Sequence, residues 1–299
     1  MTGPIVEETK TWNAFMSFVE RTHVVGSVFQ SAYYYRGQPR AAWDTLWPSL
    51  LRLARNADLQ PDAAVEVEKL LVSRFKVQAF THLSHAAVAD ATLLGWWSLM
   101  QHHGVPTRLL DWTKSIYVAA YFAVESEPEH DSALWVVHPR SVRVALTAKF
   151  PAVPRIGHLT DDGFWRSDSL ADLEFLGPTR ETSRMTAQQT LFSLSRWVLA
   201  DHGAIIGDAV KQEQDRRKPV LFCKVLIPRQ AKPLFLRRLA EEHHGRFVVP
   251  WYRWTRAVTR RAGEARVGGR ESRGCDRCDR IVAVVGHRLT RTRGRSLGH

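Results

Sequence analysis

The sequence predicts an α+β fold with helices packed on a small sheet, and three observations support that class. Apolar residues make up 44% and charged residues 24% of the 299 residues, as in a soluble globular protein. Helix-like and strand-like segments follow one another without the regular strand–helix–strand order of a parallel sheet. No apolar run approaches the ~20 residues that a transmembrane helix needs, so no membrane partner is expected.

Several segments have the features of helices. Apolar residues recur in them at helical spacing, or Pro and Gly are absent over a long stretch. Pro48 is typical of the first position of a helix, and Gly104 is typical of the residue that follows a helix end. The predicted helices cover residues 11–25, 48–57, 62–83, 95–104, 115–125 and 233–245.

Strands are predicted where aromatic or β-branched runs are bounded by Gly or Pro. They cover residues 31–38, the end of segment 104–113, and residues 133–139, 184–197 and 219–228. The stretch from 150 to 184 is rich in loop-forming residues and predicts no regular element.

The cysteine content and the N-terminus both point to the cytoplasm. Three cysteines exclude a disulfide framework and are typical of a reducing compartment. The N-terminus lacks the basic-then-apolar order of a secretory signal. No metal site is predicted, because Cys275 and Cys278 lack a second pair and the adjacent His102 and His103 point to different sides.

The net charge of +12 is concentrated in the C-terminal segment. Residues 246–299 contain 14 arginines and 4 acidic residues, whereas residues 1–245 contain 28 basic and 26 acidic residues. The segment 246–299 has few apolar residues, so burial cannot offset its ordering entropy and we expect it to be disordered. An Arg-rich tail is also typical of proteins that bind nucleic acid, and that partner stays open.

The densest polar cluster lies between residues 101 and 113, around a Gly-Val-Pro turn that joins a helix to a strand. Such a turn aims several side chains at one place. His103 and Asp111 are the candidate catalytic residues, with His103 as an acid or base, while Gln101, Arg108 and Thr113 are candidate ligand-binding residues. A structural alternative stays open, in which Asp111 caps the following helix and Arg108 braces or pairs with it.

A second cluster ends the strand at residues 31–38. Arg36 can hold a phosphate or carboxylate with its planar fork, Gly37 lets a ligand approach the backbone, and Gln38 is a further ligand-binding candidate. In the alternative, Arg36 is a structural residue paired to an internal carboxylate such as Asp111. We expect Arg36, His103, Arg108 and Asp111 to converge in space, because separate polar clusters in one domain often build one site.

The residues of both clusters resemble the FRG domain, a bacterial and phage-borne family named for an aromatic-Arg-Gly motif. Residues 35–38 match that motif with Tyr in place of Phe, residues 43–52 resemble its W…PSL-x-R segment, and the block 100–123 is the most distinctive part. Residues 184–192 are similar to an Arg…Gln-Gln-Gly-x-Phe segment, with Thr190 in place of Gly. The resemblance implies an FRG core over residues 26–140 that continues through 141–245, after an N-terminal helix at 1–25.

The order of motifs also resembles that of ADP-ribosyltransferases, which implies a fold of that kind. In those enzymes an Arg-Gly strand holds an NAD phosphate, a Ser/Thr segment supports the nicotinamide ribose, and a later strand carries a catalytic Glu. The later strand here has Gln188 and Gln189 instead, which we take as ligand-binding candidates, and no catalytic Glu is assigned.

Three functions from different classes stay open. The chain binds a phosphate-bearing nucleotide such as NAD, in a pocket built by Arg36 and residues 101–113, and acts on it as an NAD-using enzyme. Alternatively, the same pocket belongs to a non-catalytic ligand-sensing module. The third function is nucleic-acid binding through the basic tail. The oligomeric state is not predicted.

The resemblance to the FRG family also bears on the tail. FRG-like chains end with Ser-Leu-Phe-Pro-Gly/Asp-x-Asp-Gly-Leu-Ala after the last predicted helix, whereas residues 247–256 here read FVVPWYRWTR. Codons for these residues, read one base later, force Gly at the 251–252 and 254–255 junctions and permit Ser-Leu-Phe-Pro-Gly-Ile-Asp-Gly-Leu-Ala. We infer that a frameshift replaced the family's C-terminus from about residue 246, in which case the tail's charge says nothing about partners.

Overall fold

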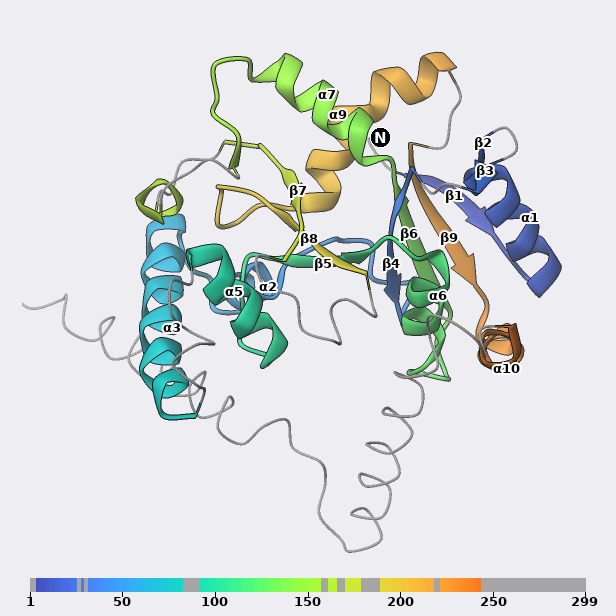
Figure 1. Cartoon of the computed structure of the whole chain (residues 1–299), viewed down its shortest axis with the longest axis horizontal. Coiled ribbons are helices and arrows are strands. Elements are labelled where there is room, and N and C mark those ends of the chain that lie inside the picture. The colour runs from blue at the N-terminus through green and yellow to red at the C-terminus, as the bar shows by residue number, and fades with distance from the viewer. Residues whose placement is uncertain are drawn as a thin grey trace, which may run out of the picture.

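The computed structural model describes residues 4–25, 28–29, 32–82, 92–156, 161–165, 170–178, 189–217 and 221–242. The segment 246–299 lies outside the described residues, and so do the expectations of disorder and of a frameshift there. The described residues form an α+β fold, as predicted, with helices on both faces of a mixed sheet (Figure 1). Within these residues no helix combines the length and the apolar character that crossing a membrane requires.

The main sheet has the strand order β1-β9-β6-β4-β5-β8-β7. Strands β1 and β9 run parallel, whereas the other neighbouring strands in it are antiparallel. Its strands are β1 (Ile5–Glu8), β4 (Tyr34–Gln38), β5 (Leu110–Thr113), β6 (Ser132–Val137), β7 (Glu174–Leu176), β8 (Thr190–Leu194) and β9 (Phe222–Ile227). A separate two-stranded sheet joins β2 (Val24–Val25) to β3 (Val28–Phe29).

Helices account for most of the remaining described residues. They are α1 (Trp12–His23), α2 (Ser49–Asn56), α3 (Pro61–His82), α5 (Leu93–His102), α6 (Ile116–Val124), α7 (Pro139–Lys149), α9 (His202–Arg217) and α10 (Lys232–Glu242). Short 3₁₀ turns occur at η2 (Asp161–Phe164) and η3 (Arg229–Ala231).

Strand β6 separates two hydrophobic cores, because successive side chains of a strand point to opposite faces. Leu134 and Val136 lie in a core with α1, α6 and α10, whereas Trp135 and Val137 lie in a core with α7 and α9. Burial on both faces makes β6 a central strand. A third core packs α2, α3 and α5 against the end of the sheet that contains β8.

Most of the predicted elements overlap the observed ones. Strands β4, β5, β6, β8 and β9, and helices α1, α2, α3, α5, α6 and α10, fall on the segments predicted for them. Gly104 follows α5 with φ +76°, which confirms its predicted place after the helix end. Pro48 is the N-cap of α2 rather than its first helical residue. No sequence pattern predicted β1, β7, α7 or α9.

Candidate functional site

The candidate site lies where two neighbouring strands of the sheet separate. Strands β4 and β5 are antiparallel, with Tyr35 paired to Thr113. The same register would set Gly37 opposite Asp111, but the ladder contains no such pair. Instead Arg36 reaches across, and its Nη1 donates a hydrogen bond to the backbone carbonyl of Asp111 at 2.8 Å. Where β4 and β5 separate, the guanidinium of Arg36 therefore bridges the two strands.

Helix α6 approaches β4 closely at Gly37. A Cβ on Gly37 would lie 2.1 Å from the carbonyl oxygen of Ala119 and 2.6 Å from the amide nitrogen of Ala123. The missing side chain is therefore required by the backbone of α6. Gly37 also lines the cavity described below, and the expectation that it lets a ligand approach the backbone stays a prediction.

Arg36 is a cation without a carboxylate partner among the described residues. Its Nε is buried and has no hydrogen-bond partner there. Burial lowers the pKa of the Arg36 guanidinium, the Asp111 carboxylate acts in the opposite direction, and the nearby Arg52 lowers it further. An arginine nevertheless stays protonated in proteins. Arg36 thus keeps a positive charge and hydrogen-bond donors that an anion can use.

The exposed Asp111 carboxylate is oriented by two hydrogen bonds in series. Gln101 Nε2 donates to Asp111 Oδ2 at 2.9 Å, and Thr107 Oγ1 donates to Gln101 Oε1. Because Thr107 occupies the amide oxygen, the amide nitrogen of Gln101 faces Asp111. The N-cap of α6 is Ser115, whose side chain accepts from the backbone of the helix, so the capping alternative for Asp111 is wrong.

Arg36, Gln101 and Asp111 line a cavity of about 380 Å³, which is formed mainly by residues of β4, α5, β5, α6 and β8. Of the residues predicted to form a site, Arg36, Gly37, Gln101, Asp111 and Thr113 line this cavity. The structure therefore brings the two sequence clusters together at one place.

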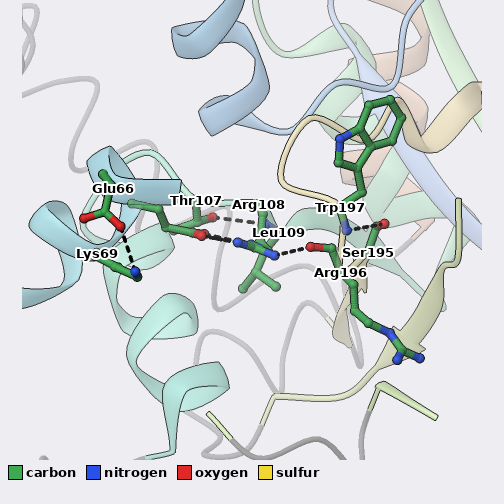
Figure 2. A network of polar contacts seen from close by, with 9 residues as sticks. Glu66, Lys69, Thr107, Arg108, Leu109, Ser195, Arg196 and Trp197 are labelled. Atoms are coloured by element: carbon green, nitrogen blue, oxygen red, sulfur yellow. Dashed lines mark hydrogen bonds and ion pairs between the residues drawn. The ribbon is translucent and has the colours of Figure 1, made fainter. Parts of the chain in front are cut away.

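Arg108 lies outside the cavity and has a structural role. It is fully buried and its Nε contacts the two carboxylate oxygens of Glu68 at 2.9 and 3.1 Å. Its Nη1 donates to the carbonyl oxygen of Arg196 at 2.6 Å (Figure 2). Arg108 is thus paired with Glu68 and not with Asp111, and it does not converge with the site.

The other predicted residues also lie away from the cavity or outside the described chain. Gln38 is buried, and its side-chain oxygen accepts from the indole N–H of Trp135. His103 is the C-cap of α5 and is not part of the cavity lining. Gln189 precedes the cavity-lining Thr190 and has a φ of 48°, whereas Gln188 lies outside the described residues.

The cavity also contains polar residues that sequence reasoning did not assign to it. His102, rather than His103, lines the cavity, because consecutive residues at a helix end point in different directions. Glu125 and Ser126 follow α6 and line it as well. The sequence feature that could have indicated them is their position as the first two polar residues after an apolar helix. Among the described residues no cluster of three or more His, Cys, Asp or Glu is placed to hold a metal ion.

A buried polar chain lies next to the cavity. Trp112 lines the cavity and donates through Nε1 to Ser193 Oγ at 2.9 Å, and Ser193 Oγ lies 2.8 Å from His202 Nδ1. Burial lowers the pKa of His202 to about 3, and the charges of Arg36 and Arg108 contribute to this. His202 is therefore neutral near pH 7.

Lowering the pH should destabilise the folded chain through His202. Its pKa is about 3 when folded and 6.5 without the fold, so between these values the unfolded chain binds the extra proton. Stability from this group is complete above the higher value and falls as the pH drops toward the lower one. We expect urea unfolding of His202→Gln to depend less on pH over this range than wild type. Equal pH dependence of the two chains would contradict this assignment.

The site residues fall in a region that matches a known family. The model of the FRG domain matches residues 31–132, which include β4, α5, β5 and α6. Neither a curated protein nor a solved structure matches the chain, so the resemblance to ADP-ribosyltransferases rests on motif order alone. Strand β9 and helix α10 lie beyond the matched residues. The family match therefore shows an FRG domain over residues 31–132, and the aromatic-Arg-Gly strand at the centre of the site lies within it.

Proposed function

We propose that the cavity between β4, α5 and α6 binds a phosphate-bearing nucleotide. The observation that carries the proposal is the state of Arg36. Its guanidinium makes one hydrogen bond to a backbone carbonyl, its Nε has no partner, and no carboxylate among the described residues forms an ion pair with it. A partly buried arginine of this kind gains a charge-assisted, bidentate partner when a phosphate binds.

Asp111 supports the assignment to a nucleotide rather than to phosphate alone. Its carboxylate is exposed at the cavity, and Gln101 holds one of its oxygens. An ionised carboxylate accepts further hydrogen bonds, so the remaining capacity suits the hydroxyls of a ribose. The cavity of about 380 Å³ is at the small end of ligand sites, which fits one nucleotide moiety of a larger molecule such as NAD.

Catalysis is a second, narrower proposal, and the polar lining of the cavity favours it. Asp111, Glu125 and His102 all line the same cavity as Arg36. Carboxylates and an imidazole are the groups that proton transfer and glycosidic-bond cleavage use. Release of nicotinamide from NAD by the full chain, lost in Asp111→Asn and Glu125→Gln, would support an enzyme. NAD binding without nicotinamide release would favour a ligand-sensing module.

The binding proposal is tested by replacing Arg36. Arg36→Ala should raise the Kd of the tightest NAD-binding site by about 10- to 100-fold, as expected for the loss of a charge-assisted hydrogen bond. Arg36→Lys should restore little of this affinity, because a point charge does not replace the planar fork. Calorimetric titration of NAD and of ADP-ribose into the full chain measures both effects.

Arg40→Ala is the matched control. Arg40 lies just after β4 and is already paired with Glu127 at 2.9 Å, outside the lining of the cavity. This variant should bind NAD as wild type does. The proposal fails if neither nucleotide binds the wild-type chain, or if Arg36→Ala and Arg40→Ala bind NAD equally well.

A further inference from the structure

A second cavity, which we call the α7 groove, shares no lining residue with the candidate site. It has a volume of about 1070 Å³ and is lined by residues from α7, the segment 150–156, strand β7 and the start of β4. Helix α7 and strand β7 lie at the same side of the molecule in Figure 1. Most of the residues that line the groove lie beyond the family match, which ends at residue 132.

Both carboxylates in the α7 groove are already occupied. Arg155 Nε donates to Glu174 Oε1 at 2.8 Å, and Arg196 Nε donates to Asp172 Oδ2 at 2.6 Å. These pairs cancel in charge and form part of the wall of the groove.

Two further arginines of the groove have no such partner. Arg140 and Arg143 lie in the first turns of α7, both exposed, and neither forms an ion pair or side-chain hydrogen bond with another described residue. Residues three apart on a helix lie side by side, so both guanidiniums can reach one anion. The N-terminus of α7 adds positive potential at the same place.

The rest of the groove is aromatic and aliphatic. Tyr34 and Phe175 meet edge to face with ring centroids 5.3 Å apart. Phe150, Leu146 and Ile156 complete the apolar lining. Burial raises the pKa of Tyr34, and Arg143 lies close enough to oppose this, which places the guanidinium near the aromatic wall.

We propose that the α7 groove is a second binding site and that it takes a nucleoside phosphate, with Arg140 and Arg143 on the phosphate and the base against Tyr34 and Phe175. An anion joined to a flat apolar body matches the two kinds of surface that the groove combines. The same chemistry is presented by a free mononucleotide and by a unit of single-stranded RNA. The inference is independent of the proposed function, because it concerns different residues.

The experiment uses the full chain carrying Arg36→Ala, so that nucleotide binding at the candidate site is weakened and residual binding reports the groove. AMP is titrated by calorimetry, and a fluorescein-labelled oligoadenylate is titrated by anisotropy. Arg140→Gln with Arg143→Gln should reduce binding at least ~10-fold, the scale of one lost charge-assisted contact. Binding of AMP identifies a free nucleotide as the ligand, whereas binding of the oligoadenylate alone identifies an RNA strand.

The matched control removes two charges from another helix. Arg237 and Arg238 are exposed on α10 and do not line the groove, and Arg237→Gln with Arg238→Gln should change binding less than ~2-fold. If neither probe binds, or if both double variants reduce binding equally, the α7 groove is not a nucleotide site. Loss of both AMP binding and oligoadenylate binding through Arg36→Ala alone would overturn the second site and leave the proposed function standing.

Discussion

Gly37→Ala is expected to prevent the chain from folding stably. The new Cβ would lie 2.1 Å from the carbonyl oxygen of Ala119 and 2.6 Å from the nitrogen of Ala123, and both are backbone atoms of α6. No rotamer change relieves such a contact, so α6 must move away from β4. Overpacking usually costs 1–3 kcal/mol, and displacing a whole helix should cost more than about 3 kcal/mol. Urea unfolding followed by circular dichroism measures the loss.

Gly177→Ala is the control for this prediction. Gly177 is exposed, and a Cβ there would have no atom within 4 Å. Its replacement should leave stability unchanged or raise it by up to about 1 kcal/mol, because alanine reduces the entropy of the unfolded chain. Equal stability of the Gly37→Ala and Gly177→Ala chains would show that α6 does not pack on β4 as described.

Arg108→Met should destabilise the chain by about 3–5 kcal/mol, because it leaves the Glu68 carboxylate buried and uncompensated. The side chains of Arg108 and Glu68 are 1% and 0% exposed, so solvent cannot replace the lost partner. The ring of Trp97, whose centroid lies 4.9 Å from the guanidinium carbon, loses a contact as well. Chemical unfolding of wild type and variant measures the difference.

A double variant distinguishes two causes of destabilisation: the loss of the charge that pairs with Glu68, and the loss of side-chain volume at residue 108. Glu68→Leu combined with Arg108→Met removes both charges, and we expect it to recover at least half of the stability that Arg108→Met loses. The exposed neighbouring pair provides a control: Lys69→Met, which removes the partner of Glu66, should cost less than about 1 kcal/mol. A double variant less stable than Arg108→Met would contradict this account.

The sequence predicts strands and helices best where the pattern is local. Segments with a sustained helical or strand pattern and clear Gly or Pro boundaries became α3, α6, β6 and β9. Strand β1 has only four residues, two of them glutamates, and it forms because β9 supplies a parallel partner. Helix α9 contains two glycines, which weaken the helical signal. Helix α7 was findable, because Pro139 stands at its first turn after the capping His138.

The candidate site was only partly predictable for a similar reason. The two polar clusters correctly predicted that Arg36 and Asp111 lie close together. They wrongly predicted that Arg108 pairs with Asp111, because Arg108 pairs with Glu68. The sequence analysis did not single out Glu68, because a charged residue within a predicted helix is usually exposed to solvent. It shares the apolar face of α3 with Val65, Leu71 and Val72, and a lone acid on such a face signals a buried partner. The choice of His102 over His103 depends on where α5 ends, which a sequence pattern does not define to one residue.

The parallel pairing of β1 with β9 has a consequence for how the protein is made. Thr9, which follows β1, donates through its hydroxyl to the carbonyl of Leu226, 217 residues further along the chain. During synthesis β1 is translated before the other described strands of this sheet, and it must therefore wait for β9, which is translated after all of them. Closing so long a loop slows folding relative to a fold with local pairings. This edge of the sheet therefore forms only after β9 has been translated, and until then β1 lacks the strand with which it pairs.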